Sequence, residues 1–251
     1  MNSKLEKFKD PGYKPDENTK TEIEQLNKEG ESLSGFQLKF ADLKKADLVD
    51  ANLTSCELKR ANLSNASMYG ANLEGANLFK ADLEGTNLKN ANLKNTELLG
   101  ANFTNTKLHN VNWGEEGKII NELEAEKSQD FHVAQTKYKE AEEIYCAIRL
   151  TMQGQSLGDE ASTVFIREMV CKRKQYPKYS LFRIMSKFAD VTIGYGESLK
   201  RIIGSIFAVI FVSALLYGLE GVSYLGRTLG FFVDDLQQYG IWATLGDLFY
   251  F

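Results

Sequence analysis

The sequence repeats every five residues from about Glu31 to Trp113, and this period constrains the fold more than any other feature. Each repeat carries a large apolar residue, nearly always leucine, and a small residue, usually alanine, two positions before it. The large residues are Leu33, Leu38, Leu43, Leu48, Leu53, Leu58, Leu63, Met68, Leu73, Leu78, Leu83, Leu88, Leu93, Leu98, Phe103, Leu108 and Trp113. A five-residue period matches neither a helix nor a strand. The chain must therefore turn a corner every five residues.

The residue types within a repeat predict how that corner is made. A short extended piece places Ala71 and Leu73 on one face and turns Asn72 to the other. The residue two positions after the leucine is often glycine or asparagine, which tolerate the positive φ of tight turns. These residues are Gly35, Asn65, Gly70, Gly75, Gly85, Asn90, Asn95, Gly100, Asn105 and Asn110. We expect a coil with a narrow apolar interior, because a disordered tract has no reason to hold its apolar register.

The repeat resembles the A(D/N)LXX motif of the pentapeptide-repeat family, as in Ala51-Asn52-Leu53 and Ala81-Asp82-Leu83. This resemblance implies a mainly β solenoid, a right-handed quadrilateral β-helix in which four pentapeptides make one coil. The seventeen registers would give about four coils. We assign residues 31–116 to this solenoid. The family has no common enzymatic activity; its members are mostly structural or protein-interaction modules, with a subgroup that mimics DNA.

Residues 1–30 form a polar leader without the apolar core of a secretory signal peptide. Ile23 and Leu26 lie on one face of a short helix expected over about 18–28. We expect this helix to cap the solenoid, whose first coil would otherwise expose an unpaired edge. We expect disorder before residue 17.

Residues 117–176 change to a helical period. An apolar stripe predicts one helix: Phe131, Ala134, Tyr138, Ala141, Tyr145, Ile148 and Met152. Gly154 to Gly158 interrupts it, and Ser156 followed by Asp159 predicts a cap for a second helix ending near Gln175. The inner face expected for that helix consists of Ala161, Phe165 and Met169. An antiparallel helical hairpin is the simpler interpretation, and an intermolecular coiled coil is the alternative.

Residues 177–201 form a basic juxtamembrane segment, and residues 202–219 form an uncharged apolar run. The run would be about 27 Å long as a helix, close to the thickness of a hydrocarbon core. We expect one transmembrane helix, which also offers a surface for homo-oligomerisation. Lys200 and Arg201 precede the run and Arg227 is the only basic residue after it, so the N-terminal side should be cytoplasmic in the cell membrane. Residues 220–251 would then be extracytoplasmic or interfacial.

The C-terminal part also resembles the first half of a two-transmembrane potassium-channel-like domain. The matching residues, in order, are Gly194-Tyr195-Gly196-Glu197, Arg201, Leu216-Tyr217 and the closing segment from Leu245 to Phe251. However, a selectivity filter lies between two membrane helices, whereas this Gly-Tyr-Gly precedes the first apolar run. We therefore interpret it as a juxtamembrane turn. The chain ends where a pore helix would begin, so we expect an incomplete pore region.

No residue set in the sequence indicates catalysis, a cofactor or a metal. The three cysteines (Cys56, Cys146 and Cys171) are scattered, and His109 and His132 lack evident catalytic partners. We expect no enzyme and, from the net charge of -4, no nucleic-acid partner. The function that fits is a membrane-anchored scaffold or regulatory module with a protein partner on the solenoid face. The alternative is a soluble DNA mimic that binds a topoisomerase, but the repeat carries nine acidic and nine basic residues rather than an acidic excess.

Overall fold

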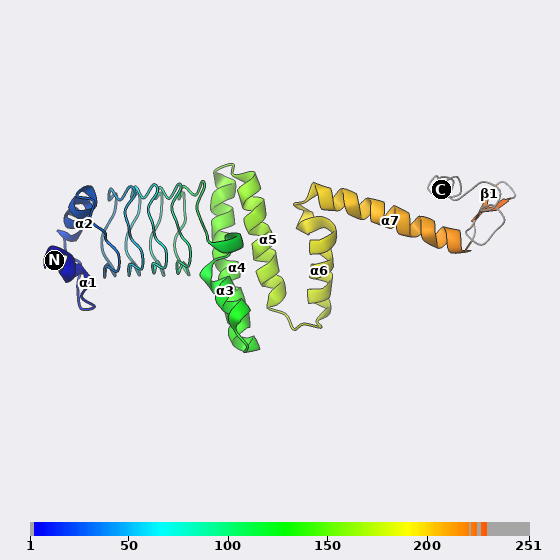
Figure 1. Cartoon of the computed structure of the whole chain (residues 1–251), viewed down its shortest axis with the longest axis horizontal. Coiled ribbons are helices and arrows are strands. Elements are labelled where there is room, and N and C mark those ends of the chain that lie inside the picture. The colour runs from blue at the N-terminus through cyan, green and yellow to red at the C-terminus, as the bar shows by residue number, and fades with distance from the viewer. Residues whose placement is uncertain (1–2, 221, 225–226, 230–251) are drawn as a thin grey trace. The chain divides into compact units, whose positions relative to one another are not determined.

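The computed structural model describes residues 3–220, 222–224 and 227–229. The chain divides into two compact units, residues 1–184 and 185–251. The first unit holds a solenoid between N-terminal and C-terminal helices (Figure 1). The second unit holds most of one amphipathic helix and one long apolar helix.

The solenoid advances by one coil every 20 residues. Parallel bridges join each polar residue to the residue 20 positions later, from Gln37 with Glu57 to Asn92 with Asn112. Four pentapeptides therefore make one coil. The small residues and leucines are buried in the interior, where Ala71 and Leu73 have no exposed area. This confirms the inward register that the sequence predicts.

Each corner uses a residue in the left-handed region of φ. All sixteen positions two residues after the registers from Leu33 to Leu108 have a positive φ. The prediction holds at the glycines and asparagines and extends to other types, including Phe40, Lys45 and Arg60. The preceding asparagine or aspartate stabilises the turn, because its side chain accepts a hydrogen bond from the backbone N–H two residues later, as Asn72 does from Glu74.

Helices α1 (Ser3–Lys9) and α2 (Thr19–Lys28) cover the first coil. The Gln37 N–H donates to the Phe8 carbonyl, and the Lys20 ammonium donates to the Lys44 carbonyl at 2.8 Å. These bonds satisfy edge groups that have no coil before them. Ile23 and Leu26 are buried, as predicted. The expectation of disorder before residue 17 is wrong, because α1 buries the Phe8 ring against the ring of Phe36.

The other end of the solenoid is covered by helices. The turn η1 (Glu115–Gly117) leads to α3 (Ile120–Lys127), which the sequence pattern did not predict. Helices α4 (Phe131–Gly154) and α5 (Gly158–Lys174) pack against each other as an antiparallel pair (Figure 1). The last coil bonds to α4 through the Thr151 hydroxyl, which donates to the Phe103 carbonyl at 3.1 Å.

Three details of the predicted helix pair are wrong. Phe131 is exposed, because it is the first residue of α4 and lies at the end of the stripe. The buried face of α5 consists of Ala161, Val164, Glu168 and Cys171 rather than of Phe165 and Met169. Ser156 makes no side-chain cap, since Leu157 occupies the N-cap position and α5 starts at Gly158.

The second unit begins within helix α6 (Leu181–Ile193) and continues through the turn η2 (Gly194–Gly196) to α7 (Leu199–Glu220). The Gly-Tyr-Gly segment is thus a turn between two helices, with positive φ at all three residues. A short hairpin follows, in which β1 (Val222–Tyr224) pairs antiparallel with β2 (Arg227–Leu229). The pore-region expectation for the segment from Leu245 to Phe251 lies outside the described residues.

Candidate interaction surfaces

One column of the solenoid has a surface unlike the other columns. The bridges Gln37 to Glu57, Glu57 to Asn77 and Asn77 to Glu97 place four repeats above one another. Together with the two residues that follow each leucine, these repeats form what we call the Lys59 face: Gln37, Lys39, Phe40, Glu57, Lys59, Arg60, Asn77, Phe79, Lys80, Glu97, Leu99 and Gly100. The face combines four basic residues, two acidic residues and three large apolar side chains.

The apolar and basic side chains of the Lys59 face contact each other. The Lys59 and Lys80 ammonium groups lie 5.0 and 5.2 Å from the centroid of the Phe79 ring. The Arg60 guanidinium lies 5.9 Å from the Phe40 ring, and that ring is 64% exposed. Aromatic and basic side chains held together on a rigid backbone are typical of protein-binding surfaces. The five-residue pattern does not reveal this face, because its residues come together only when the repeats are aligned every 20 residues.

The other columns carry no comparable excess of positive charge. The column of Asp42, Asn62, Asp82 and Asn102 is the most acidic of the four. It has three acidic residues, and Lys44 and Lys45 oppose them. The Asn62 side-chain amide donates a hydrogen bond to the Asp42 carboxylate at 2.9 Å. Part of the negative charge is therefore already bound within the column. The solenoid therefore lacks the continuous acidic surface that a DNA mimic needs.

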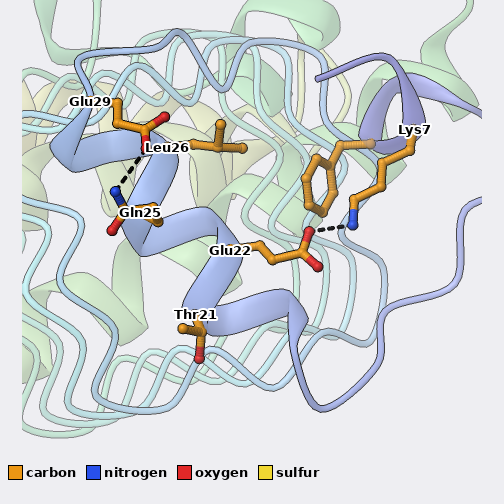
Figure 2. A pocket seen from close by; sticks show the side chains of 7 residues that line it. Lys7, Thr21, Glu22, Gln25, Leu26 and Glu29 are labelled. Atoms are coloured by element: carbon orange, nitrogen blue, oxygen red, sulfur yellow. Dashed lines mark hydrogen bonds and ion pairs between the residues drawn. The ribbon is translucent and has the colours of Figure 1, made fainter. Parts of the chain in front are cut away.

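A pocket of about 490 Å³ opens between α1 and α2. Phe8 and Leu26 supply its apolar lining, and polar side chains surround them (Figure 2). Lys7 forms an ion pair with Glu22, which raises the Lys7 pKa above its ordinary value. The Gln25 amide donates to Glu29 at 2.7 Å. Because the Lys7–Glu22 pair joins α1 to α2 and the other polar groups bind within α2, we assign the pocket to the N-terminal cap.

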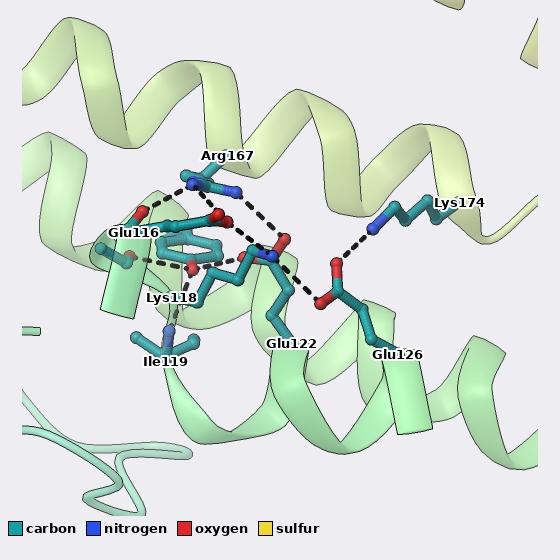
Figure 3. A network of polar contacts seen from close by, with 9 residues as sticks. Glu116, Lys118, Ile119, Glu122, Glu126, Arg167 and Lys174 are labelled. Atoms are coloured by element: carbon teal, nitrogen blue, oxygen red, sulfur yellow. Dashed lines mark hydrogen bonds and ion pairs between the residues drawn. The ribbon is translucent and has the colours of Figure 1, made fainter. Parts of the chain in front are cut away.

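A network of charged residues joins the end of the solenoid to α3, α4 and α5 (Figure 3). Its centre is the fully buried Glu122, which accepts a 2.7 Å hydrogen bond from the Tyr145 hydroxyl. The Arg167 guanidinium lies 3.6 Å from Glu122 and donates to the Glu116 carbonyl at 2.5 Å. Removing one partner of such a buried pair costs about 3–5 kcal/mol, so this network fixes the cap on the solenoid.

The titration of the buried groups also indicates a structural role for this network. Burial, followed by the nearby Glu122 carboxylate, raises the pKa of both the Tyr145 hydroxyl and the Cys171 thiol. Both groups are therefore poor nucleophiles. His109 lies 3.3 Å from Glu160 at the edge of the last coil, as an exposed pair. Among the described residues, no three His, Cys, Asp or Glu side chains gather as metal ligands would.

Helix α7 is long and apolar enough to cross a membrane, judged by length and composition. Its 18-residue window from Leu199 to Leu216 has a mean hydropathy of 2.0. Only 6% of that window is buried within the structure. The large apolar side chains therefore lack a protein core to cover them.

Comparison with known proteins identifies the repeats. The family profile "Pentapeptide repeats" matches residues 37–75, 56–95 and 76–112. No curated protein matches the chain.

Solved structures of pentapeptide-repeat proteins are similar to the chain. The protein Rfr23 from the cyanobacterium Cyanothece 51142 is 38% identical over 36% of this chain and 60% of its own, with a TM-score of 0.34. The protein alr5209 from Nostoc PCC 7120 is 27% identical over 38% of this chain and 84% of its own, with a TM-score of 0.25. QnrB1, a plasmid-mediated fluoroquinolone resistance protein, is 25% identical over 33% of this chain and 57% of its own, with a TM-score of 0.20.

These comparisons give no support to the potassium-channel resemblance of the C-terminal part. The family match and the 20-residue coils together show that residues 37–112 are pentapeptide repeats.

Proposed function

We propose that this protein is a membrane-anchored scaffold, in which α7 crosses the membrane and the solenoid binds a protein partner. The exposed α7 is the observation that carries the proposal. Each large apolar side chain left in water costs about 1.5–3 kcal/mol relative to burial. The window from Leu199 to Leu216 exposes ten of them, and a hydrocarbon core removes this cost.

The distribution of basic residues sets the orientation of the proposed anchor. Lys200 and Arg201 stand at the start of α7, and further basic residues precede them in α5 and α6. After the helix, Arg227 is the only basic residue. Basic segments next to a membrane helix stay on the cytoplasmic side, so the solenoid would be cytoplasmic.

The Lys59 face is the surface on which we place the partner. Its charge and its exposed Phe40 ring suit a protein with an acidic surface and an apolar contact. A DNA mimic would need the opposite charge. A matched pair of variants tests the face: Phe40→Ala combined with Arg60→Ala should weaken partner capture, whereas Lys89→Ala on another column should not.

Alkaline extraction of membranes from cells that express the full chain tests the anchor. The wild-type chain should stay in the membrane pellet. A control variant with Ile206→Lys, Val209→Lys and Val212→Lys should move to the soluble fraction, because charged side chains at the centre of a span oppose insertion. Release of the wild-type chain by alkali would overturn the proposal.

Cysteine labelling with a membrane-impermeant reagent tests the orientation. In a background without the native cysteines, Ser223→Cys should react in intact cells. A cysteine in place of Ser34 on the solenoid should react only after the cells are permeabilised. The reverse pattern would refute the orientation, although the anchor itself would stand.

A further inference from the structure

Helix α6 separates its residue types onto two faces. At 100° per residue, the large apolar residues fall within one continuous arc. Six of them form what we call the apolar face of α6: Leu181, Phe182, Ile184, Met185, Phe188 and Val191. Arg183, Ser186, Lys187 and Asp190 occupy the opposite arc. In a soluble protein the apolar face of such a helix is buried against a core.

The apolar face of α6 is instead exposed. Its six side chains are between 55% and 72% exposed, and no residue of α6 is buried. The smallest and largest values belong to Ile184 and Phe182. An exposed apolar patch of this kind marks a surface that binds a partner or a membrane.

The polar side of α6 makes the bonds to the following turn and helix. The Arg201 guanidinium of α7 donates to the Asp190 carboxylate at 3.1 Å and to the Asp190 carbonyl at 2.7 Å. The Ser186 hydroxyl is 2.9 Å from the Tyr195 hydroxyl in η2. These contacts form an elbow that holds the polar side of α6 against the start of α7. The apolar face is therefore turned away from that junction.

We propose that α6 lies in the interfacial layer of the membrane that α7 crosses, with its apolar face toward the acyl chains. This proposal rests on the membrane anchor proposed above. The helix is about 20 Å long, so it can lie along the surface without spanning the bilayer. A basic polar face opposite a Phe- and Leu-rich face is the composition of interfacial helices.

The charge of the segment favours a lipid surface with anionic headgroups over a second copy of the chain. Between residues 172 and 193 there are six basic residues, of which Lys172 and Lys174 form ion pairs with Glu142 and Glu126. The one acidic residue, Asp190, is paired with Arg201. Arg183 and Lys187 lie on α6 itself. Two copies packed through the apolar face would leave these cations on the outer side, where the pairing makes no use of them. At an anionic surface each basic residue instead strengthens binding by about five-fold.

Two probe positions on α6 test the proposal in the full chain. In a background with Cys56→Ala, Cys146→Ser and Cys171→Ala, an environment-sensitive fluorophore is attached at Met185→Cys on the apolar face or at Lys187→Cys on the polar face. The two positions are about 200° apart around the helix. The protein is reconstituted into vesicles of phosphatidylcholine and phosphatidylglycerol, and quenching by aqueous iodide is measured.

The expected result is that iodide quenches the probe at position 185 about five-fold less than the probe at position 187. Equal quenching of both probes would place α6 in water and would overturn the inference. Equal protection of both would show that protein surrounds the helix, with the same consequence.

Alkaline extraction of the same vesicles separates this inference from the proposed anchor. If the chain resists extraction but iodide quenches both probes equally, the membrane anchor stands and the interfacial helix is wrong. If alkali removes the chain although position 185 was protected before extraction, the interfacial helix stands and the membrane anchor is wrong.

Discussion

Replacement of Leu73 by alanine tests the interior of the solenoid. Leu73 has no exposed area, and hydrogen bonds to the following coil and within its own coil hold its backbone. Its N–H donates to the Asn92 carbonyl at 2.8 Å, and its carbonyl accepts from Ala76 and from the Thr96 hydroxyl, both at 2.9 Å. A backbone fixed in this way cannot collapse into the space left by the side chain. We therefore expect Leu73→Ala to lower the free energy of unfolding by about 3–4 kcal/mol, within the range for a buried leucine.

Glu74→Ala is the matched control at the next position. Glu74 points outward and is half-buried, and its carboxylate accepts one long hydrogen bond of 3.3 Å from the Asn92 amide. Loss of a single contact of this kind should cost about 0.5 kcal/mol. The two substitutions alter neighbouring residues of the same repeat, so the difference between them measures the inward register.

The buried thiol of Cys56 provides the assay. Cys56 lies inside the solenoid, where its thiol donates to the Leu33 carbonyl at 2.9 Å, so a thiol reagent reaches it only when the coils open. In a background without Cys146 and Cys171, a loss of 3 kcal/mol should raise the labelling rate by about 150-fold. The control should change the rate by about two-fold. Similar rates for the two variants would refute the inward register.

Three further predictions follow from buried groups and from the elbow. Thr86→Val should lower the free energy of unfolding in urea by about 1 kcal/mol, because the buried hydroxyl donates to the Leu63 carbonyl at 2.7 Å; an unchanged midpoint would contradict this. Burial raises the pKa of the Cys56 thiol from 9.0 to about 12. The contribution of the protonated thiol to the free energy of unfolding is therefore complete below pH 9 and is lost as the pH rises toward 12. Urea midpoints should therefore fall less above pH 9 in Cys56→Ala than in the wild type, and parallel pH curves would argue against this assignment. Gly194→Ala should disturb the elbow, since φ is 55° and an added Cβ would lie 2.9 Å from the Ser198 Cβ, yet the fraction that resists alkaline extraction should not change; release from the membrane would show that the anchor needs the turn.

The period of the repeat was sufficient to predict the interior of the solenoid. Side chains 20 residues apart stack on one another in successive coils, and each repeat turns the same two positions inward. The same residue types therefore fit these positions in every repeat. The corners could be predicted only in part. Glycine and asparagine are typical of a positive φ, whereas Phe40 and Arg60 are not, although both adopt it here. At those positions the hydrogen bonds between coils hold the backbone in a conformation that costs an L-residue about 1–2 kcal/mol.

The C-terminal helices show where sequence patterns fail. Glu168 and Glu122 look like surface residues, yet both are buried, because Arg149 pairs with Glu168 at 2.7 Å and Tyr145 with Glu122. The buried face of α5 therefore contains a charged residue and is rotated from the predicted apolar stripe. A pattern of hydrophobicity cannot show this, because the partner lies on another helix.

The sequence alone determined the repeat, the inward register, the apolar run of α7 and the helix pair α4 and α5. These features depend on the spacing of residues that are close together in the sequence, so the sequence is enough to predict them. The tertiary structure decided how the solenoid ends are closed, which charges are buried, and which outward residues gather on the Lys59 face. Those features join residues that are 20 or more positions apart, and a contact between them exists only after the chain has wound into coils and the helices have packed against their edges.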